Sequence, residues 1–328
     1  MKYLLGVQPS PDLDHVHPVL SSADRSCKPA AEPVTWAGKL GFPAGKRVIL
    51  LHADDIGMCY EANASAQRSL KAGDYQSAAA MVPCPWFNEM ATWCIENPQY
   101  DVGLHLALTS EWRFYRWGSV APRNKVPGLY DKMGYLYNDV RSVVMNARDE
   151  EVEAEIFAQY DRAIQLGMKP SHIDTHMGTL YAKPAFTRAY LKLAVEKKVP
   201  AMVIEMTPYT LDKFRKQGYP LNDEFVQMVK DYPMPKLDDF HGIEFAKTYE
   251  EKKSKFYTMV KSMKPGLHEV IYHPSIDTPG LKKITGSWQQ RIWEDRMFAD
   301  QEVKDFLKSE DVIITNWREL MQRFEKTK

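Results

Sequence analysis

Cysteine is scarce in this sequence, and long apolar runs are missing. Four of the 328 residues are cysteines, with no Cys-X-X-Cys pair and no zinc-finger spacing to histidine. A chain of this size with so few, scattered thiols is not a disulfide scaffold, so we expect the cysteines to be reduced and structural. No stretch approaches the ~18 continuous apolar residues of a membrane span, so we expect no membrane partner.

An excess of charge of either sign is also missing. The 43 basic and 43 acidic residues give a formal net charge of zero, which argues against nucleic acid as the main partner. Hydrophobic residues make up 44% and charged residues 26%, ordinary values for a globular chain with a sizeable core. The length suits one α/β barrel of roughly 250 residues with insertions.

The N-terminal segment lacks sustained periodicity. Proline, serine and aspartate recur at short intervals through the first 45 residues, and the initial apolar run stops at Val7, too short for a signal peptide. We therefore expect an extended arm over residues 1–45 that packs on the body or on a second subunit. Residues 46–328 then form a single barrel domain. A cytoplasmic location and a homodimer are further expectations.

An apolar run that passes directly into acidic residues stands at residues 47–60, RVILLHADDIGMCY. It predicts a buried strand whose carboxyl end opens into a loop, the edge where parallel α/β sheets build their sites. Neighbouring side chains on an extended strand point to opposite sides, so Asp54 and Asp55 cannot do the same job. One can hold a cation while the other accepts a proton from a bound water. Standing alone, the pair is more typical of a turn with a helix N-cap.

Two later strands end in similar polar residues. In residues 101–108, DVGLHLAL, the alternation places His105 on a face with small neighbours, where its side chain has room to reach a shared centre. In residues 170–181, PSHIDTHMGTLY, one side of a short strand carries His172, Asp174 and His176. Three polar side chains on one face of a strand do not contribute to an apolar core. A metal or catalytic centre is therefore favoured over a structural network.

The rest of the chain alternates strand-like and helix-like segments. We expect strands near residues 48–51, 76–82, 101–108, 172–176, 201–205, 267–273 and 312–315. Helices are expected near residues 61–72, 86–96, 148–166, 184–198, 248–263, 288–308 and 317–325. About seven strand–helix units without an internal repeat predict an α/β fold, an irregular or incomplete TIM-like (β/α) barrel in a single domain. The aromatic side chains of the long connection over residues 109–146 suit either stacking on a sugar or a satellite hydrophobic cluster.

The chain resembles the YdjC-like carbohydrate deacetylases, the family of chitooligosaccharide deacetylase. The resemblance covers roughly residues 46–318 and depends on the order of four segments: Ala53-Asp54-Asp55-Ile56-Gly57, Gly103-Leu104-His105-Leu106, His172-Ile173-Asp174-Thr175-His176 and His273-Pro274. It implies an irregular barrel that removes acetyl groups from N-acetylated amino sugars with one divalent metal ion. It also implies that the metal ligands are Asp55, His105 and His176, with Asp54 as the general base.

This sequence departs from the family pattern at two positions. Family members often have a further histidine where this sequence has Gly178, and their typical phenylalanine is Ile56 here. Neither change removes a ligand that the resemblance implies.

The residue types suit amide hydrolysis by themselves. Two imidazoles and one carboxylate leave open positions on a divalent ion, which can lower the pKa of bound water towards ~7 and act as a Lewis acid. The ligand set suits zinc, while water-filled positions would also suit magnesium or manganese.

Further roles are expected for the remaining polar residues. We expect His273 to be the general acid, and His172 and Asp174 to contact substrate or to orient His176. His52 is expected to fill the barrel interior. Two alternatives stay open: another barrel metallohydrolase, such as an amidohydrolase or phosphoesterase, and a non-catalytic, metal-containing sugar-binding protein. The absence of a GxxxxGK motif and of a basic cluster weighs against phosphate substrates.

Overall fold

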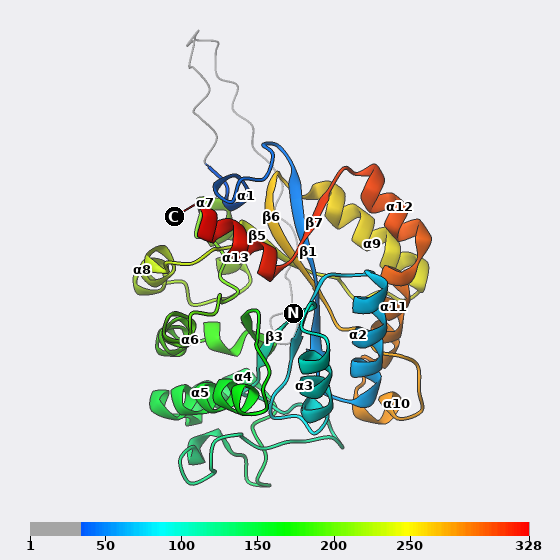
Figure 1. The fold of residues 1–328 in the computed structure, drawn as a ribbon. Coiled ribbons are helices and arrows are strands. Elements are labelled where there is room, and N and C mark those ends of the chain that lie inside the picture. Colours follow the sequence, from blue (N-terminus) through cyan, green and yellow to red (C-terminus); the bar gives the residue numbers. More distant parts are fainter. Residues whose placement is uncertain (1–33, 328) are drawn as a thin grey trace, which may run out of the picture.

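Parallel strands form the centre of the protein in a computed structural model that describes residues 34–327 (Figure 1). Within this range seven strands make one sheet, in the order β4-β3-β2-β1-β6-β5, with β7 also paired to β1. The strands are β1 (Arg47–Ile56), β2 (Ser77–Ala80), β3 (Asp101–Leu106), β4 (Ile173–Thr175), β5 (Asp239–Gly242), β6 (Gly266–Tyr272) and β7 (Ile313–Thr315).

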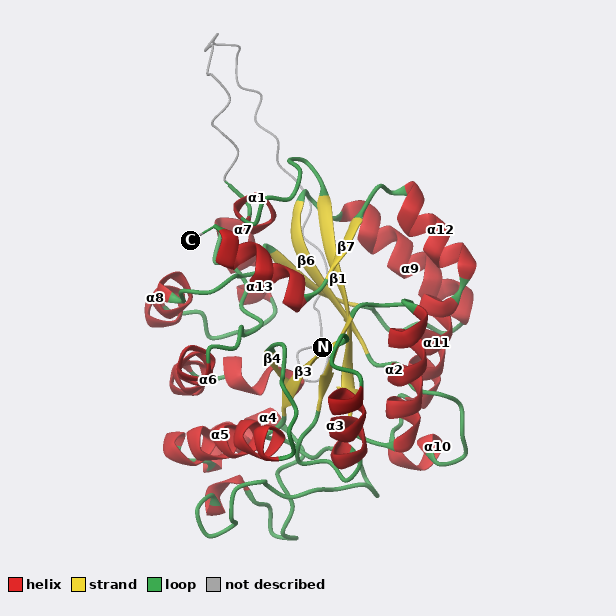
Figure 2. Cartoon of the chain, in the orientation of Figure 1, coloured by secondary structure: helices red, strands yellow, loops and turns green. Residues whose placement is uncertain are grey.

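Helices surround these strands on both sides (Figure 2). In the view of Figure 1, α2, α9, α11 and α12 lie to the right of the strands, and α5, α6 and α8 lie to the left. The helices are α1 (Trp36–Lys39), α2 (Tyr60–Ala72), α3 (Phe87–Glu96), α4 (Val140–Asn146), α5 (Asp149–Gln165), α6 (Pro184–Lys197), α7 (Pro208–Lys216), α8 (Asp223–Asp231), α9 (Tyr249–Ser262), α10 (Leu281–Ile284), α11 (Trp288–Ala299), α12 (Gln301–Ser309) and α13 (Trp317–Lys326), with 3₁₀ turns η1 (Pro127–Leu129) and η2 (His176–Tyr181).

The barrel is incomplete, as the sequence predicted. β4 and β5 stand at the two ends of the strand order, and the chain between them contributes only isolated parallel bridges, Ile173 to Ala201 and Ile204 to Leu237. The strand expected at residues 201–205 is therefore reduced to these bridges. β5 was not expected, because its sequence DFHG contains no apolar run. The fold is an irregular, TIM-like α/β half-barrel.

β1 occupies the middle of the sheet and is buried along almost its whole length. It pairs with β6 along one edge, and with β7 and then β2 along the other. A strand covered on both faces needs a nearly continuous apolar run, which residues 48–51 supply. We expected a loop after residue 51, but the strand continues to Ile56. It therefore carries Asp54 and Asp55 to the centre of the sheet's carboxyl edge.

The helix expected over residues 288–308 is two helices, α11 and α12. Asp300 separates them: its backbone is extended (φ −69°, ψ 125°), and its side chain accepts a hydrogen bond from the Glu302 N–H. This is the geometry of an N-cap, for which aspartate is one of the preferred residues.

Only residues 34–45 of the predicted N-terminal arm are described. They form the one-turn helix α1 and pack on the body instead of staying extended. The Trp36 indole N–H donates to Glu205 at 2.8 Å, and the Trp36 backbone N–H donates to Asp238 at 2.8 Å. Cys27 lies outside the described residues, whereas the other three cysteines are free thiols. Burial raises the pKa of Cys59 to about 12, so this thiol is not an activated nucleophile.

The long connection after β3 lies at the end of the sheet where β1 also ends (Figure 1). Trp112 and Trp117 are buried there, with ring centroids 5.1 Å apart, so these two rings belong to a satellite hydrophobic cluster. Phe114 is 70% exposed. Within residues 34–327, no helix is both long and apolar enough to cross a bilayer.

Helix α5 fixes this connection through two buried polar side chains. Glu155 accepts the backbone N–H groups of Val120 (2.9 Å) and Ala121 (2.8 Å). Gln159 accepts the N–H of Ala107 at 3.1 Å and donates to its carbonyl at 2.7 Å. Hydrogen bonds from α5 therefore fix the chain both before and after the segment that contains Trp112 and Trp117.

Candidate metal centre

A β-bulge at the end of β1 directs its two adjacent carboxylates. The pairing of β1 with β2 shifts register between Ala53 and Ile56, and Asp55 has a φ of +62°. Bulges re-aim side chains next to active sites, and aspartate is among the few residues that tolerate the left-handed region. Asp54 and Asp55 consequently do not point to opposite sides. Both lie beside His105, Asp54 Oδ1 at 4.0 Å from its Nδ1 and Asp55 Oδ1 at 3.5 Å from its Nε2.

Three predicted ligands converge at this point. Asp55 Oδ1 lies 3.1 Å from His176 Nδ1, and His176 Nδ1 lies 3.2 Å from His105 Nε2. Ligand atoms about 2.1 Å from a divalent ion, at angles of roughly 90–110°, stand about 3.0–3.4 Å apart. Asp55 Oδ1 is buried and has no hydrogen-bond partner among the described residues. The donor set and the orphaned oxygen fit a divalent cation.

His105 is oriented for this role by a cross-strand neighbour. β3 and β4 pair in a register that sets His105 opposite Asp174, and Asp174 Oδ1 accepts the His105 Nδ1–H at 2.7 Å. With Nδ1 protonated, Nε2 presents its lone pair to Asp55 and His176. We expected Asp174 to orient His176, but its hydrogen bonds are to His105 and His52.

Glu111 and Arg291 complete the surroundings of the ligands. Glu111 Oε1 accepts from His176 Nε2 at 2.9 Å, and Arg291 Nη2 donates to Asp55 Oδ2 at 2.6 Å. Sequence reasoning missed both residues. Glu111 belongs to a connection without periodicity, and Arg291 belongs to a polar helix, α11, in which nothing distinguishes it from a solvent-facing arginine.

These charges hold the ligands in defined ionisation states. Burial alone would raise the pKa of Asp55, but Arg291, followed by His176, holds that pKa well below its usual range. Burial lowers the pKa of His176, yet the carboxylates of Glu111 and Asp55 together raise it to about 10. Asp55 is therefore an anion and a ready oxygen ligand, whereas His176 carries a proton at neutral pH and must release it to bind a metal ion.

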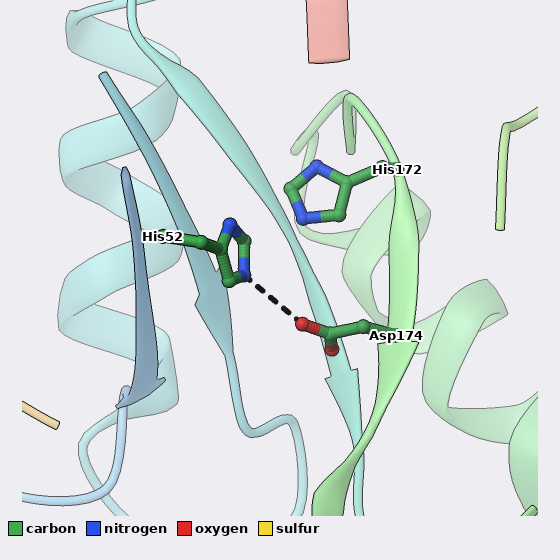
Figure 3. Close-up of side chains that lie close together, drawn as sticks. All are labelled: His52, His172 and Asp174. Carbon is green, nitrogen blue, oxygen red and sulfur yellow. Dashed lines mark hydrogen bonds and ion pairs between the residues drawn. The ribbon is translucent and has the colours of Figure 1, made fainter. Parts of the chain in front are cut away.

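A second polar layer lies deeper in the barrel (Figure 3). His52 on β1 and Asp174 on β4 point toward each other, with His52 Nε2 at 3.0 Å from Asp174 Oδ2 and at 3.3 Å from Asp54 Oδ1. Serine 77 fixes the other ring nitrogen, because Ser77 Oγ lies 2.9 Å from His52 Nδ1. His52 thus links Asp54 to Asp174, as a barrel-interior residue with a specific set of contacts.

His172 belongs to this deeper layer and is fully buried. Its Nδ1 lies 3.6 Å from Asp101 Oδ1, and its ring stacks on Trp317 with the ring centroids 5.4 Å apart. The ring also needs a glycine at position 103, because a Cβ at Gly103 would lie 2.5 Å from the imidazole. This placement differs from the expected contact with substrate or His176.

His273 follows the end of β6 at the mouth of the site. Its side chain is 36% exposed, and its Nε2 lies 3.9 Å from Asp54 Oδ2. The His273 backbone N–H donates to Glu294 Oε2 at 2.6 Å, and Lys252 pairs with the same carboxylate at 2.5 Å. The predicted general acid thus stands beside the predicted general base, on a backbone that a buried ion pair holds.

The sequence model of the YdjC-like proteins matches residues 48–309. The chain belongs to the YdjC-like family. A carbohydrate deacetylase of Thermus thermophilus is 29% identical over 271 residues, which cover 82% of this chain and 92% of that protein. A carbohydrate deacetylase of Thermoanaerobacter pseudethanolicus is 22% identical and covers 83% of this chain and 98% of its own length.

A solved structure supports the fold of this YdjC-like chain. A candidate cellobiose-phosphate cleavage protein of Enterococcus faecalis V583 aligns with a TM-score of 0.68 and 23% identity, over 84% of this chain and 99% of its own. The match to the family model includes every side chain of the candidate metal centre, from Asp54 to Glu294. The family expected from the strand-end residues is confirmed.

Proposed function

We propose that this protein is a metal-dependent carbohydrate deacetylase that hydrolyses the amide bond of N-acetylated amino sugars. The observation that carries the proposal is the position of Asp54. This carboxylate lies outside the triangle of Asp55, His105 and His176, with its Oδ1 4.0 Å from His105 Nδ1. The names of the YdjC-like relatives support the substrate class.

Asp55, His105 and His176 are the proposed ligands of one divalent ion. When bound, this ion supplies a Lewis acid for the amide carbonyl and lowers the pKa of a coordinated water. Two nitrogens and one oxygen suit zinc, while further water ligands would suit magnesium or manganese. Asp174 keeps the His105 lone pair directed at the site, and Glu111 does the same for the His176 ring.

Asp54 is the proposed general base. Its Oδ1 is buried and lacks a hydrogen-bond partner among residues 34–327, so it is free to accept a proton from the attacking water. His52 lies 3.3 Å from this oxygen, on the interior side of the carboxylate. Because Asp54 and Asp55 lie at opposite ring nitrogens of His105, one serves as base while the other serves as ligand.

His273 is the proposed general acid. Amide hydrolysis needs a proton for the leaving amine, and His273 is the partly exposed imidazole at the mouth. Its Nε2 lies 3.9 Å from Asp54 Oδ2, close enough for one substrate or water atom to contact both side chains, which supports this pairing of acid and base.

The test is acetate release from N-acetylglucosamine oligomers by protein stripped of metal and then reloaded with zinc, magnesium or manganese. We expect release to depend on the ion. Asp54→Asn should lower turnover by about 10²–10⁴-fold while metal binding is retained. Asp212→Asn, an exposed aspartate of α7, is the matched control and should keep wild-type turnover.

Two results would contradict the proposal. No acetate from any ion-loaded sample would exclude deacetylation of these sugars and favour a binding protein or a different hydrolase. Full activity of Asp54→Asn would remove Asp54 from the chemistry.

A further inference from the structure

A second group of two imidazoles and one carboxylate lies outside the barrel. β5 and β6 pair in a register that sets Asp239 opposite His268, and His241 follows two residues later on the same face of β5. The next residue of β6, Glu269, contacts Trp317 and interacts electrostatically with His52, in the barrel interior. His268 therefore faces the other way, toward the helices that cover the sheet.

The three side chains meet, with one possible ligand atom from each within 4.8 Å of the other two. His241 Nε2 lies 3.1 Å from His268 Nδ1 and 3.5 Å from Asp239 Oδ2. These separations again equal those of ligand atoms about 2.1 Å from one divalent ion. The outer face of a barrel strand is normally apolar, so three buried or partly buried ligand-type residues at this point need a physical reason.

Two of the three ligand residues, His268 and Asp239, are held by a neighbour on the atom that faces away from the cluster. His268 Nε2–H donates to the Lys264 carbonyl at 2.8 Å, which leaves Nδ1 as the acceptor facing His241. Asp239 Oδ1 accepts from Lys213 Nζ at 2.5 Å, so Oδ2 is the oxygen that remains. Partners on the far atom of a ligand are typical of metal sites.

The exposure of the cluster also suits a cation. The other charged groups facing this cluster are Lys213, from α7, and Asp238, ahead of β5. The His241 side chain is 15% exposed, which gives an ion a path from solvent.

The geometry points to a second divalent-metal site formed by Asp239, His241 and His268, whose two nitrogens and one oxygen suit zinc. The site joins β5 to β6 at the end of the strand order, beside the gap in the barrel that only isolated bridges span. Its role is structural.

The experiment counts zinc equivalents in the full-length, metal-stripped protein by calorimetric titration. His241→Gln should bind one equivalent fewer than the wild type, and zinc should raise its unfolding temperature less. Asp239→Asn should lose the same equivalent, and it serves as the second variant if His241→Gln folds poorly. His17→Gln, an identical change in the N-terminal segment, is the matched control and should keep the wild-type count.

Acetate release by metal-loaded His241→Gln should equal that of the wild type, which separates this site from the proposed function. Cobalt in place of zinc gives a second readout, since an absorption band from an ion with histidine ligands should be lost with either variant. Equal zinc equivalents in the wild type, His241→Gln and Asp239→Asn would overturn the proposal. So would a loss of the same equivalent in His17→Gln alone.

Discussion

The buried carboxylate of Glu155 should make the stability of this protein fall as the pH rises. Glu155 accepts three hydrogen bonds, from Val120, Ala121 and Gln159, that favour its ionised form. Burial outweighs them and raises its pKa from the ordinary 4.5 to about 7. The change to test is Glu155→Gln, which removes the titration and keeps the size of the side chain.

The sign follows from proton binding in the two states. Between about pH 4.5 and 7 the folded protein holds a proton on Glu155 that the unfolded chain has lost. The contribution of this group is therefore fully present below pH 4.5 and is lost as the pH rises through 7. At about 1.4 kcal/mol for each pH unit, the loss amounts to about 3 kcal/mol.

The assay is urea unfolding of the wild type and of Glu155→Gln at pH values from 4 to 8. The wild type minus variant difference in unfolding free energy should fall by about 3 kcal/mol across this range. The amide's unfavourable contact with a backbone N–H is independent of pH and cancels in the slope. Glu153→Gln, a more exposed position of the same helix, is the control and should give no slope of this size. A flat difference, or one that grows with pH, would show that the three donors keep Glu155 ionised.

Three further changes test the metal centre and its support. Asp174→Asn should weaken metal binding by about 10–100-fold, because the His105 tautomer is no longer fixed. Competition with a chromophoric chelator measures the metal affinity, and an unchanged affinity would contradict this prediction. Arg291→Met should destabilise the metal-free protein by about 3–5 kcal/mol, because it leaves Asp55 unpaired and buried. A bound ion should restore most of that stability in urea unfolding, so an equal loss with and without metal would refute the role of the pair. Gly103→Ala should cost about 1–3 kcal/mol by overpacking, and an unshifted urea midpoint would contradict the close contact.

Strand ends were predictable from the sequence, and with them most of the centre. Asp54 and Asp55 follow an apolar run, His105 and His176 are placed by the alternation in and after their strands, and parallel strands bring such positions to one edge. The family and the incomplete barrel were predicted from the same residues and are confirmed.

Contacts that depend on register or on distant segments were not predictable. The partner of Asp174 is decided by the pairing of β3 with β4, which the alternation within either strand does not reveal. Arg291 reaches Asp55 across 236 residues, through the packing of a helix whose sequence is polar on several sides. β5 was not predictable because it is an edge strand of four residues, two of them polar, without the apolar run or regular alternation that indicates a strand.

The bulge at Asp55 also decides which substitutions there can be interpreted. At a φ of +62°, most residues other than glycine, asparagine and aspartate cost about 1–2 kcal/mol in backbone strain. Asp55→Ala would therefore remove the oxygen of a proposed metal ligand and also strain the main chain, and the two effects could not be separated. Asp55→Asn keeps the backbone preference and removes only the charge. If all twenty amino acids are tested at position 55, the ranking by yield of folded protein should differ from the ranking by catalytic activity. Yield depends on tolerance of a positive φ, whereas activity depends on a side-chain oxygen.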